Sequence, residues 1–307
     1  MKRKIYIPIL AFFALVGIGL IVFGAVMMSS CSKEIETATS GNPIPSGNAT
    51  VKVTFNDFSI TSEDFPTKDA VANYTGVKAM TLAFFDAQGN AVYNTTQLRA
   101  DNTSYTTFGE FELSLPLGSY TMIALGYGSE VPMTVTSATA ATYTADRVRE
   151  TFVASQAVNV TSTNPLTLNA ELSRVVSKVL VRSTDTRTAG VDSVRVTFAA
   201  GGKGVNPQTG LSTTNSGLAN CVAISSAVGA ASSTISYLFL NSDQQTMTVT
   251  VETLRTNGTV YSTRTVTDVP LQRNKVTVLR GPMYSNASGA SFTVSTSYLN
   301  DTNFVDF

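Results

Sequence analysis

Cys31 is the residue whose surroundings point most clearly to chemistry. It follows small and apolar residues at 24–30, an uncharged apolar run over residues 5–28 and a basic start over residues 2–4. A basic segment, an apolar segment and small residues before a cut make a secretory signal. We therefore expect an N-terminal secretory signal that ends close to Cys31.

This pattern resembles the lipobox of bacterial lipoproteins, in which the acylated cysteine becomes the first residue of the mature chain. It implies a signal peptide over residues 1–30 and a lipidated tether over residues 31–50. The acidic residues Glu34 and Glu36 resemble surface-export signals of lipoproteins in the Bacteroidetes. Two alternatives stay open. The run over residues 5–28 is long enough for an uncleaved signal anchor, since a crossing needs about 20 residues. The segment also suits an ordinary secretory signal with an incidental cysteine.

The composition excludes several kinds of catalytic site. The chain has no histidine, so it cannot build a Ser-His-Asp triad, a Cys-His pair or a histidine-ligated zinc site. Cys221 is the other cysteine, and its apolar neighbours predict a small buried side chain. The chain also lacks tryptophan, which removes the commonest stacking platform for sugars. We therefore expect no catalytic residue, cofactor or metal, and no enzyme activity.

Other motifs that could carry chemistry are incomplete. The glycine-rich residues 201–204 are followed by Pro207 where a dinucleotide-binding fingerprint needs glycine, so we expect a loop. Ser30 and Lys33 have the spacing of a catalytic pair, but they lie on either side of the expected cut. Removal of residues 1–30 leaves a net charge of about −3, which gives no electrostatic basis for binding nucleic acid.

From residue 51 onward the hydrophobic pattern is that of β-strands. Strict alternation is typical of half-buried strands. It runs through Val51, Val53 and Phe55; Met80, Leu82 and Phe84; Phe111, Leu113 and Leu115; Ile235, Tyr237 and Phe239; Met247, Val249 and Val251; and Phe292, Val294 and Thr296. The more continuous apolar run Tyr120–Tyr127 predicts a strand covered on both faces. We predict an all-β chain with one β-sandwich over residues 51–165 and a second over residues 166–307.

Three segments resemble the Bacteroidetes fimbrillin superfamily, the subunits of lipoprotein-derived fimbriae. They are Met80–Val92, Phe111–Gly126, and residues 269–281 with the pair Arg273-Asn274. In addition, residues 172–179 resemble the first strand of the family's second domain. The resemblance implies two tandem transthyretin-like β-sandwiches. We interpret Arg273-Asn274 as a turn that shapes the fold rather than as a binding site.

The resemblance also implies assembly by strand exchange. In the family, a protease removes the lipidated N-terminal segment together with the first strand, and a strand from the next subunit fills the groove. The candidate first strand here contains Val51, Val53 and Phe55. The candidate donor strand contains Phe292, Val294, Thr296 and Tyr298. Leu299–Phe307 extends that strand or forms a tail, and the alternative is that the whole segment closes the second sandwich.

One departure from the family pattern favours a particular role. No arginine lies between Cys31 and Arg99, so an arginine-specific protease could not release the first strand. We therefore expect a base subunit that keeps its lipid, anchors a fimbria at the surface of the outer membrane and binds other fimbrial subunits, supporting adhesion to an unidentified host or bacterial ligand. The alternatives are a proteolytically matured stalk or tip subunit, or a non-polymerising surface lipoprotein that binds glycan or another ligand. Ser193, within Asp-Ser-Val, resembles an O-glycosylation site of exported Bacteroidetes proteins.

Overall fold

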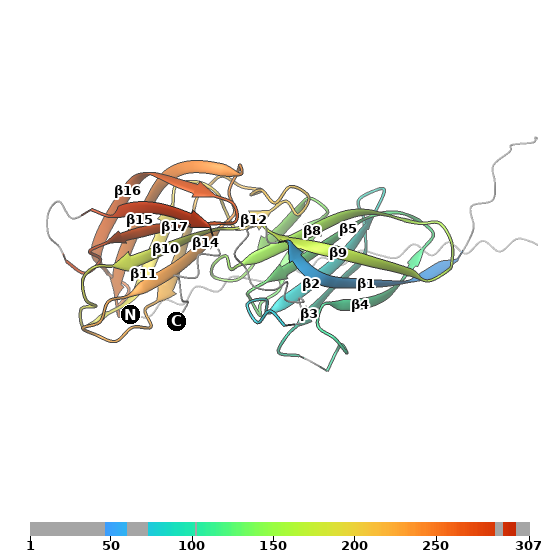
Figure 1. The fold of residues 1–307 in the computed structure, drawn as a ribbon, viewed down its shortest axis with the longest axis horizontal. Helices are drawn as coiled ribbons and strands as arrows, with labels where there is room; N and C mark the ends of the chain where they lie inside the picture. The colour runs from blue at the N-terminus through green and yellow to red at the C-terminus, as the bar shows by residue number, and fades with distance from the viewer. Residues whose placement is uncertain (1–46, 60–72, 102, 286–290, 299–307) are drawn as a thin grey trace, which may run out of the picture. The chain divides into compact units, whose positions relative to one another are not determined.

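The computed structural model describes residues 47–59, 73–101, 103–285 and 291–298. All regular secondary structure within these ranges is β-strand (Figure 1). Pro45–Phe307 form one compact unit. The predicted all-β sandwich class is confirmed. The signal peptide, Cys31 with most of the tether, and Leu299–Phe307 lie outside the described residues.

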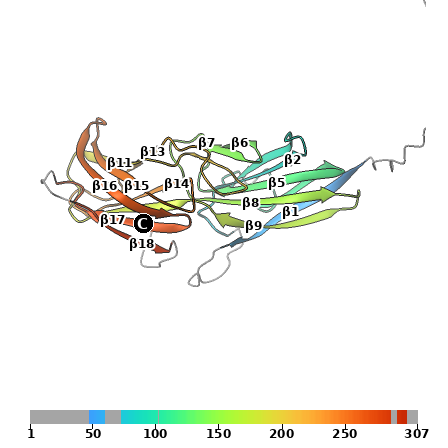
Figure 2. The same ribbon diagram turned by 90° about the horizontal axis from the view of Figure 1, so that it is seen from above.

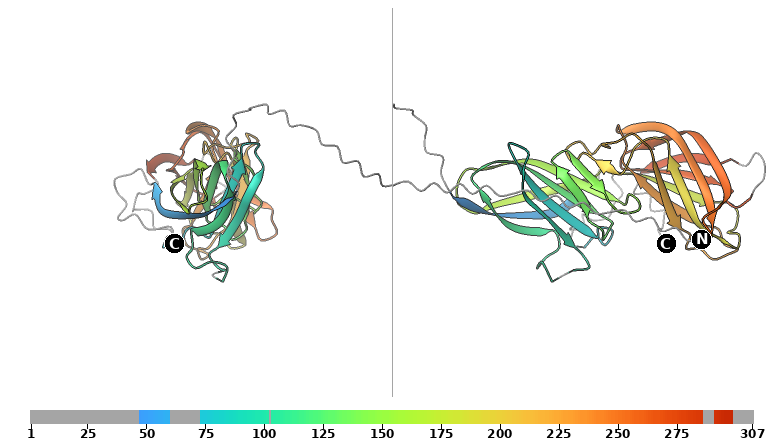
Figure 3. Two further views of the ribbon diagram at one scale, coloured as in Figure 1. Left: turned by 90° about the vertical axis from the view of Figure 1, so that its right-hand side faces the viewer. Right: turned by 180° about the vertical axis from the view of Figure 1, so that it is seen from behind.

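A seven-stranded sheet in the order β3-β2-β5-β8-β9-β1-β4 makes up the first part of the unit. Its strands are β1 (Asn48–Ser59), β2 (Ala79–Asp86), β3 (Ala91–Leu98), β4 (Glu110–Pro116), β5 (Gly118–Tyr127), β8 (Thr151–Val160) and β9 (Leu166–Arg174). Val53 of β1 and Phe84 of β2 belong to the same hydrophobic core although their strands lie far apart in this order. The sheet therefore folds over into two layers, seen from above in Figure 2 and from behind in Figure 3.

The neighbouring strands β2 and β5 are covered on both faces. This confirms the prediction for Tyr120–Tyr127, whose last six residues are all buried. The alternation predicted for β2 is wrong, because Thr81 and Ala83 are buried as well. A small sheet in the order β12-β7-β6 supplies the second cover, since Tyr143 of this sheet shares a core with Phe85 of β2. Its strands are β6 (Met133–Ser137), β7 (Ala140–Tyr143) and β12 (Gly204–Val205).

Two four-stranded sheets make up the rest of the unit, in the orders β14-β10-β17-β18 and β13-β11-β15-β16. Their strands are β10 (Ser177–Ser183), β11 (Val191–Phe198), β13 (Leu218–Ala223), β14 (Ser233–Leu238), β15 (Gln244–Arg255), β16 (Val260–Gln272), β17 (Lys275–Gly281) and β18 (Thr293–Tyr298). Val179 of β10 and Val249 of β15 are fully buried in one core. The alternation predicted in residues 247–251 is confirmed in β15. In β14 the predicted phase is wrong, because Ile235 and Tyr237 are half-buried while Ser236 between them is buried.

The glycine-rich segment joins the two parts, and the expectation of a loop is wrong at Gly204, which lies in β12. Gly204 pairs with Thr142 of β7, and Val205 pairs with Ala141. Its first glycine, Gly201, has a φ of +79°, a conformation that L side chains rarely adopt. The small sheet thereby extends a single core from the first part of the unit into the second.

The strand β9 belongs to the first sheet. Val51 of β1 pairs in parallel with Leu166 of β9, so the chain leaves the seven-stranded sheet after Arg174 rather than before Leu166. The segment 172–179, which resembles a first strand, covers the end of β9 and the start of β10. The division into two domains and their transthyretin-like character stay predictions.

Candidate strand-exchange sites

The candidate first strand is β1, and its alternating sequence explains which side chains face the core. Val51 and Val53 are fully buried, and Phe55 is 3 % exposed. Lys52 points outward, where its ammonium lies 3.3 Å from the carboxylate of Glu110 on β4. Strict alternation with β-branched residues thus positions three apolar side chains on one face.

β1 lies inside the sheet and has a neighbour on each side (Figure 1). It runs antiparallel to β4, where Val53 is opposite Phe111, and parallel to β9, where Val53 is opposite Leu168. The rings of Phe55 and Phe111 meet edge to face with centroids 6.2 Å apart. Loss of this strand would leave the main-chain edges of β4 and β9 open and would uncover these apolar side chains. The place of β1 therefore suits a strand-exchange groove.

The candidate donor strand is β18, the outermost strand of its sheet. It pairs antiparallel with β17, with Val294 opposite Leu279. Phe292, just before the strand, is buried, whereas Val294 is 38 % exposed and Thr296 is exposed. Tyr298 pairs through its main chain with Lys275, and its side chain lies outside the described part of the chain. In this chain β18 closes its own sheet, and its donation to another subunit stays a prediction.

A buried ion pair marks the end of β9. Arg174 lies 2.8 Å from the carboxylate of Glu150, and both side chains are largely buried. The Tyr74 hydroxyl donates a 2.7 Å hydrogen bond to the other oxygen of that carboxylate. Burial, reinforced by the negative charge of Glu150, raises the pKa of Tyr74, so the phenol stays protonated as a donor. The Arg174 guanidinium also lies over the ring of Phe152 at 4.9 Å.

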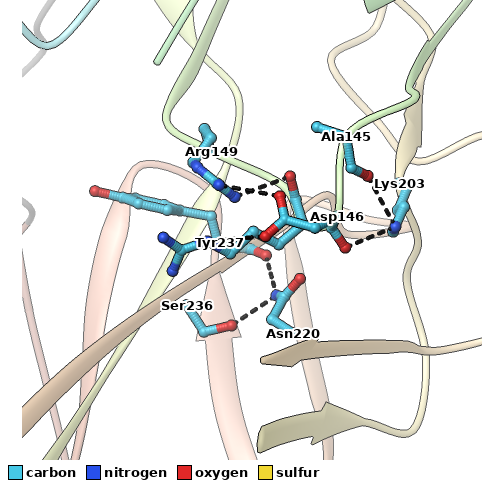
Figure 4. Close-up of polar contacts among 8 residues, drawn as sticks. Ala145, Asp146, Arg149, Lys203, Asn220, Ser236 and Tyr237 are labelled. Atoms are coloured by element: carbon cyan, nitrogen blue, oxygen red, sulfur yellow. Dashed lines mark hydrogen bonds and ion pairs between the residues drawn. The ribbon is translucent and has the colours of Figure 1, made fainter. Parts of the chain in front are cut away.

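A second polar cluster fastens the loop after β7 to the glycine-rich segment (Figure 4). The Lys203 ammonium donates to the carbonyl oxygens of Ala145 at 3.1 Å and Asp146 at 2.8 Å. Arg149 donates to the Asp146 carboxylate at 3.0 Å. Beside them, the Asn220 amide donates to the Tyr237 carbonyl at 2.9 Å. These contacts satisfy loop carbonyls and a strand carbonyl, so this cluster positions the main chain.

A cleft of about 900 Å³ lies beside the ion pair of Arg174. Its walls come from β8, β9, the loop 207–210 and the turn 272–275. Arg273 in that turn lies 2.9 Å from the carboxylate of Asp243 and donates to the Thr209 carbonyl at 2.7 Å. Sequence reasoning did not find this cleft, because its walls are far apart in the chain and carry no motif of their own.

Two predictions about single residues have clear outcomes. Ser193 lies on β11, as expected, and its hydroxyl is 3.1 Å from the Asp192 carboxylate. The prediction that Cys221 is buried is wrong, because its free thiol is exposed. The physical reason is the phase of β13. Asn220 faces inward and donates to the Ser236 hydroxyl at 2.6 Å, so the next residue must face solvent.

The predicted lipidation residue, Cys31, is not placed with the strands because it lies outside the described ranges. Within the ranges that are described, no helix has the length and apolar character needed to cross a bilayer. The structure brings Val51, Val53 and Phe55 together on one face, whereas Phe292, Val294 and Thr296 differ in exposure.

Comparison with known sequences identifies a family. The sequence profile described as a family of unknown function, DUF6562, matches residues 131–305. The match covers more than half of the chain, from just before β6 to beyond β18. No curated protein matches the chain.

Solved structures also resemble this chain. A candidate adhesin from Bacteroides ovatus is 11 % identical with a TM-score of 0.48, covering 83 % of this chain and 94 % of that protein. The fimbrial anchor protein Mfa2 from Porphyromonas gingivalis is 12 % identical with a TM-score of 0.45, covering 82 % and 98 %. A candidate cell adhesion protein from Bacteroides eggerthii is 12 % identical with a TM-score of 0.44, covering 84 % and 98 %.

Proposed function

The chain belongs to the DUF6562 family, whose function is unknown, and we propose that it is a structural subunit of a cell-surface fimbria. It sits at the base of the filament, held in the outer membrane by acyl chains on Cys31 and exposed at the cell surface. The observation that carries this proposal is the place of β1, an interior strand that follows the lipidation residue closely in the sequence.

Retention of β1 is central to the anchor role. Burial of Val51, Val53 and Phe55 contributes roughly 5–9 kcal/mol before ordering costs, at about 1.5–3 kcal/mol for each side chain. The chain has no arginine between Cys31 and Arg99, so an arginine-specific protease has no site at which to cut and release this strand. A chain that keeps β1 also keeps its lipid, because both lie on the same N-terminal segment. Two or more acyl chains give stable membrane attachment, whereas one is marginal.

The partners of the base subunit are other fimbrial subunits. Strand donation joins them, because main-chain hydrogen bonds satisfy open sheet edges while alternate side chains fill pockets. Here the segment of β18 is the candidate donor, since it is the outermost strand of its sheet and its Val294 is exposed. Through the assembled filament the subunit supports adhesion.

The two cysteines give a matched test of the anchor role. In cells that produce the fimbriae, Cys31→Ser removes the acylation site, and we expect the subunit and the fimbriae to be shed into the medium. Cys221→Ser removes an exposed thiol on β13, and we expect fimbriae to stay on the cells. Fimbriae that remain attached in the Cys31→Ser cells would contradict the anchor role.

The position in the filament has its own readout. Unboiled envelope extracts are run on a denaturing gel, on which fimbriae give a ladder of bands. A base subunit that keeps β1 is present as one copy per filament and adds a single unit to that ladder. A ladder built from repeats of this chain would assign it to the stalk instead. A chain that never joins a ladder would favour a non-polymerising surface lipoprotein that binds glycan or another ligand.

A further inference from the structure

The strands β8 and β9 pair only where they meet. Phe152 pairs with Arg174 and Val153 with Ser173, and in the same register Ala154 would face Leu172 and Gln156 would face Ala170. Those further pairs do not form between the two described strands. We call the space between residues 154–157 of β8 and residues 170–172 of β9 the β8–β9 gap. It is a place where two strands of one sheet separate and leave room between them.

The burial pattern of β8 shows that the gap opens into the sandwich. Along the face that carries Phe152 and Val158, the residues at both ends are buried, but Ala154 is half-buried and Gln156 is exposed. The outward residues Ser155 and Ala157 are exposed too, so residues 155–157 are exposed on both faces of the strand. In a closed sandwich the inward positions would be covered by the opposite layer. Ala154 and Ala170 pack against the core of the first part but stay half-buried, so among the described residues the inner side of the gap is only partly covered.

The cleft of about 900 Å³ lies over this gap. In a sheet, each residue has a rise of about 3.3 Å, a strand spacing of about 4.8 Å and a layer thickness of about 10 Å, and the product of these lengths is roughly 160 Å³. The cleft therefore has room for roughly five residues of an extended chain. The charges along the cleft balance, because Arg174 pairs with Glu150 and Arg273 pairs with Asp243. The lining residues Lys275 and Glu171 add one charge of each sign. A cleft with balanced charges and amide and hydroxyl side chains favours an uncharged occupant.

We propose that the β8–β9 gap receives an extended, uncharged strand from a neighbouring fimbrial subunit. This inference rests on the proposed function, in which β1 keeps its place and the first-strand groove is filled. The incoming main chain hydrogen-bonds to the edges of β8 and β9, and alternate side chains pack on Ala154 and Ala170. The other face of the strand meets the polar side chains of the cleft. The segment 291–298 of this chain is an uncharged candidate, since Phe292 and Val294 alternate with hydroxyl residues and the following residues 295–297 all carry hydroxyl groups.

A binding experiment on the full-length chain tests the proposal. The lipidated chain is purified from the envelope in detergent, and a fluorescent peptide with the sequence of residues 291–298 is the probe. Ala170→Arg places a large charged side chain in the gap, and Thr167→Arg places the same side chain at an exposed position of β9 that does not line the cleft. We expect Ala170→Arg to weaken binding by about tenfold or more and Thr167→Arg to change it by less than about twofold.

A disulfide keeps the test decisive if Ala170→Arg fails to fold. In a Cys221→Ser background, Gln156→Cys with Ala170→Cys places two thiols across the gap. We expect no spontaneous disulfide, because bonded cysteines need Cα atoms within about 7 Å. Spontaneous closure would overturn the proposal. Failure of the peptide to bind would also overturn it, and so would equal binding of the peptide by the two arginine variants. A neutral oligosaccharide that displaces the peptide from the natural chain but not from Ala170→Arg would overturn it as well. The intact mass of the same preparation reports acylation of Cys31, so failure of the anchor role is read separately.

Discussion

Arg174 and Asn274 lie 100 residues apart, and the Arg174 guanidinium donates a 3.1 Å hydrogen bond to the side-chain oxygen of Asn274. Asn274 has a φ of +59°, in the left-handed region that asparagine tolerates better than most residues. Its main-chain N–H donates to the Val176 carbonyl at 2.9 Å. The Arg-Asn turn between β16 and β17 is thus fastened to the passage from β9 to β10. This explains why an asparagine suits position 274.

Removal of the buried charge at Arg174 should be costly. In Arg174→Met, the Glu150 carboxylate loses its buried partner, and we expect the free energy of unfolding to fall by about 3–5 kcal/mol. The double variant Arg174→Met with Glu150→Gln should recover part of this loss, because it removes the uncompensated charge. Chemical denaturation with urea measures both.

The exposed ion pair of Lys52 and Glu110 is the matched control. Its side chains are 51 % and 37 % exposed, so Lys52→Met should change the free energy of unfolding by less than about 1 kcal/mol. Similar losses in Lys52→Met and Arg174→Met would contradict the view that burial makes the Arg174 pair important.

Local pattern predicted several of the strands but not their partners. The alternation of residues 51–55 identified β1, because one face of that strand is buried and the other is not. The same rule failed for Thr81, since the small sheet that covers the second face of β2 comes from residues far along the chain. Pairing of β9 with β1 and the separation of β8 from β9 depend on long-range register. A single sequence contains no local signal for that register.

Two glycines with left-handed φ values should respond differently to alanine. Gly89 has a φ of +83° and open space where a Cβ would lie, so Gly89→Ala should cost only the backbone conformation, about 1–2 kcal/mol. Gly201 has a φ of +79°, and its Cβ would lie 2.5 Å from the Phe239 carbonyl oxygen. We expect Gly201→Ala to lose about 3–5 kcal/mol of unfolding free energy. Thermal and urea unfolding compare the pair, and equal losses would argue against close packing of the glycine-rich segment.

The hairpin between β2 and β3 should make stability depend on pH. The Asp86 carboxylate accepts hydrogen bonds from the main-chain N–H groups of Asn90 at 2.8 Å and Gln88 at 2.9 Å, and from the Asn90 amide at 3.1 Å. These bonds, those from Asn90 above all, lower the pKa of Asp86 below its ordinary value. Because the folded pKa lies below the unfolded pKa, the carboxylate stabilises the fold above about pH 4, and this contribution is lost as the pH falls through the folded pKa.

The variant Asp86→Asn isolates this effect. We expect the difference in unfolding free energy between the natural chain and Asp86→Asn to be largest near about pH 6 and to shrink towards about pH 2–3. Urea denaturation at a series of pH values measures the difference. A difference that stays constant over this range would show that the Asp86 hydrogen bonds do not favour the ionised form.

The exposed thiol of Cys221 should react in the folded protein. In a Cys31→Ser background, we expect an aromatic disulfide reagent to label this thiol without denaturant, because β13 turns Asn220 inward and Cys221 outward. The absorbance of the released thiolate follows the reaction. Labelling that begins only when the protein is unfolded would mean that β13 has the opposite phase.

The most direct test of the anchor role is the N-terminal residue and intact mass of the chain extracted from its native envelope. The account predicts a chain that begins at Cys31, carries acyl chains and still contains Val51, Val53 and Phe55. A chain that begins beyond Phe55 would contradict it and would assign the protein to a matured stalk or tip. A chain that begins at Met1 would rule out lipoprotein processing altogether.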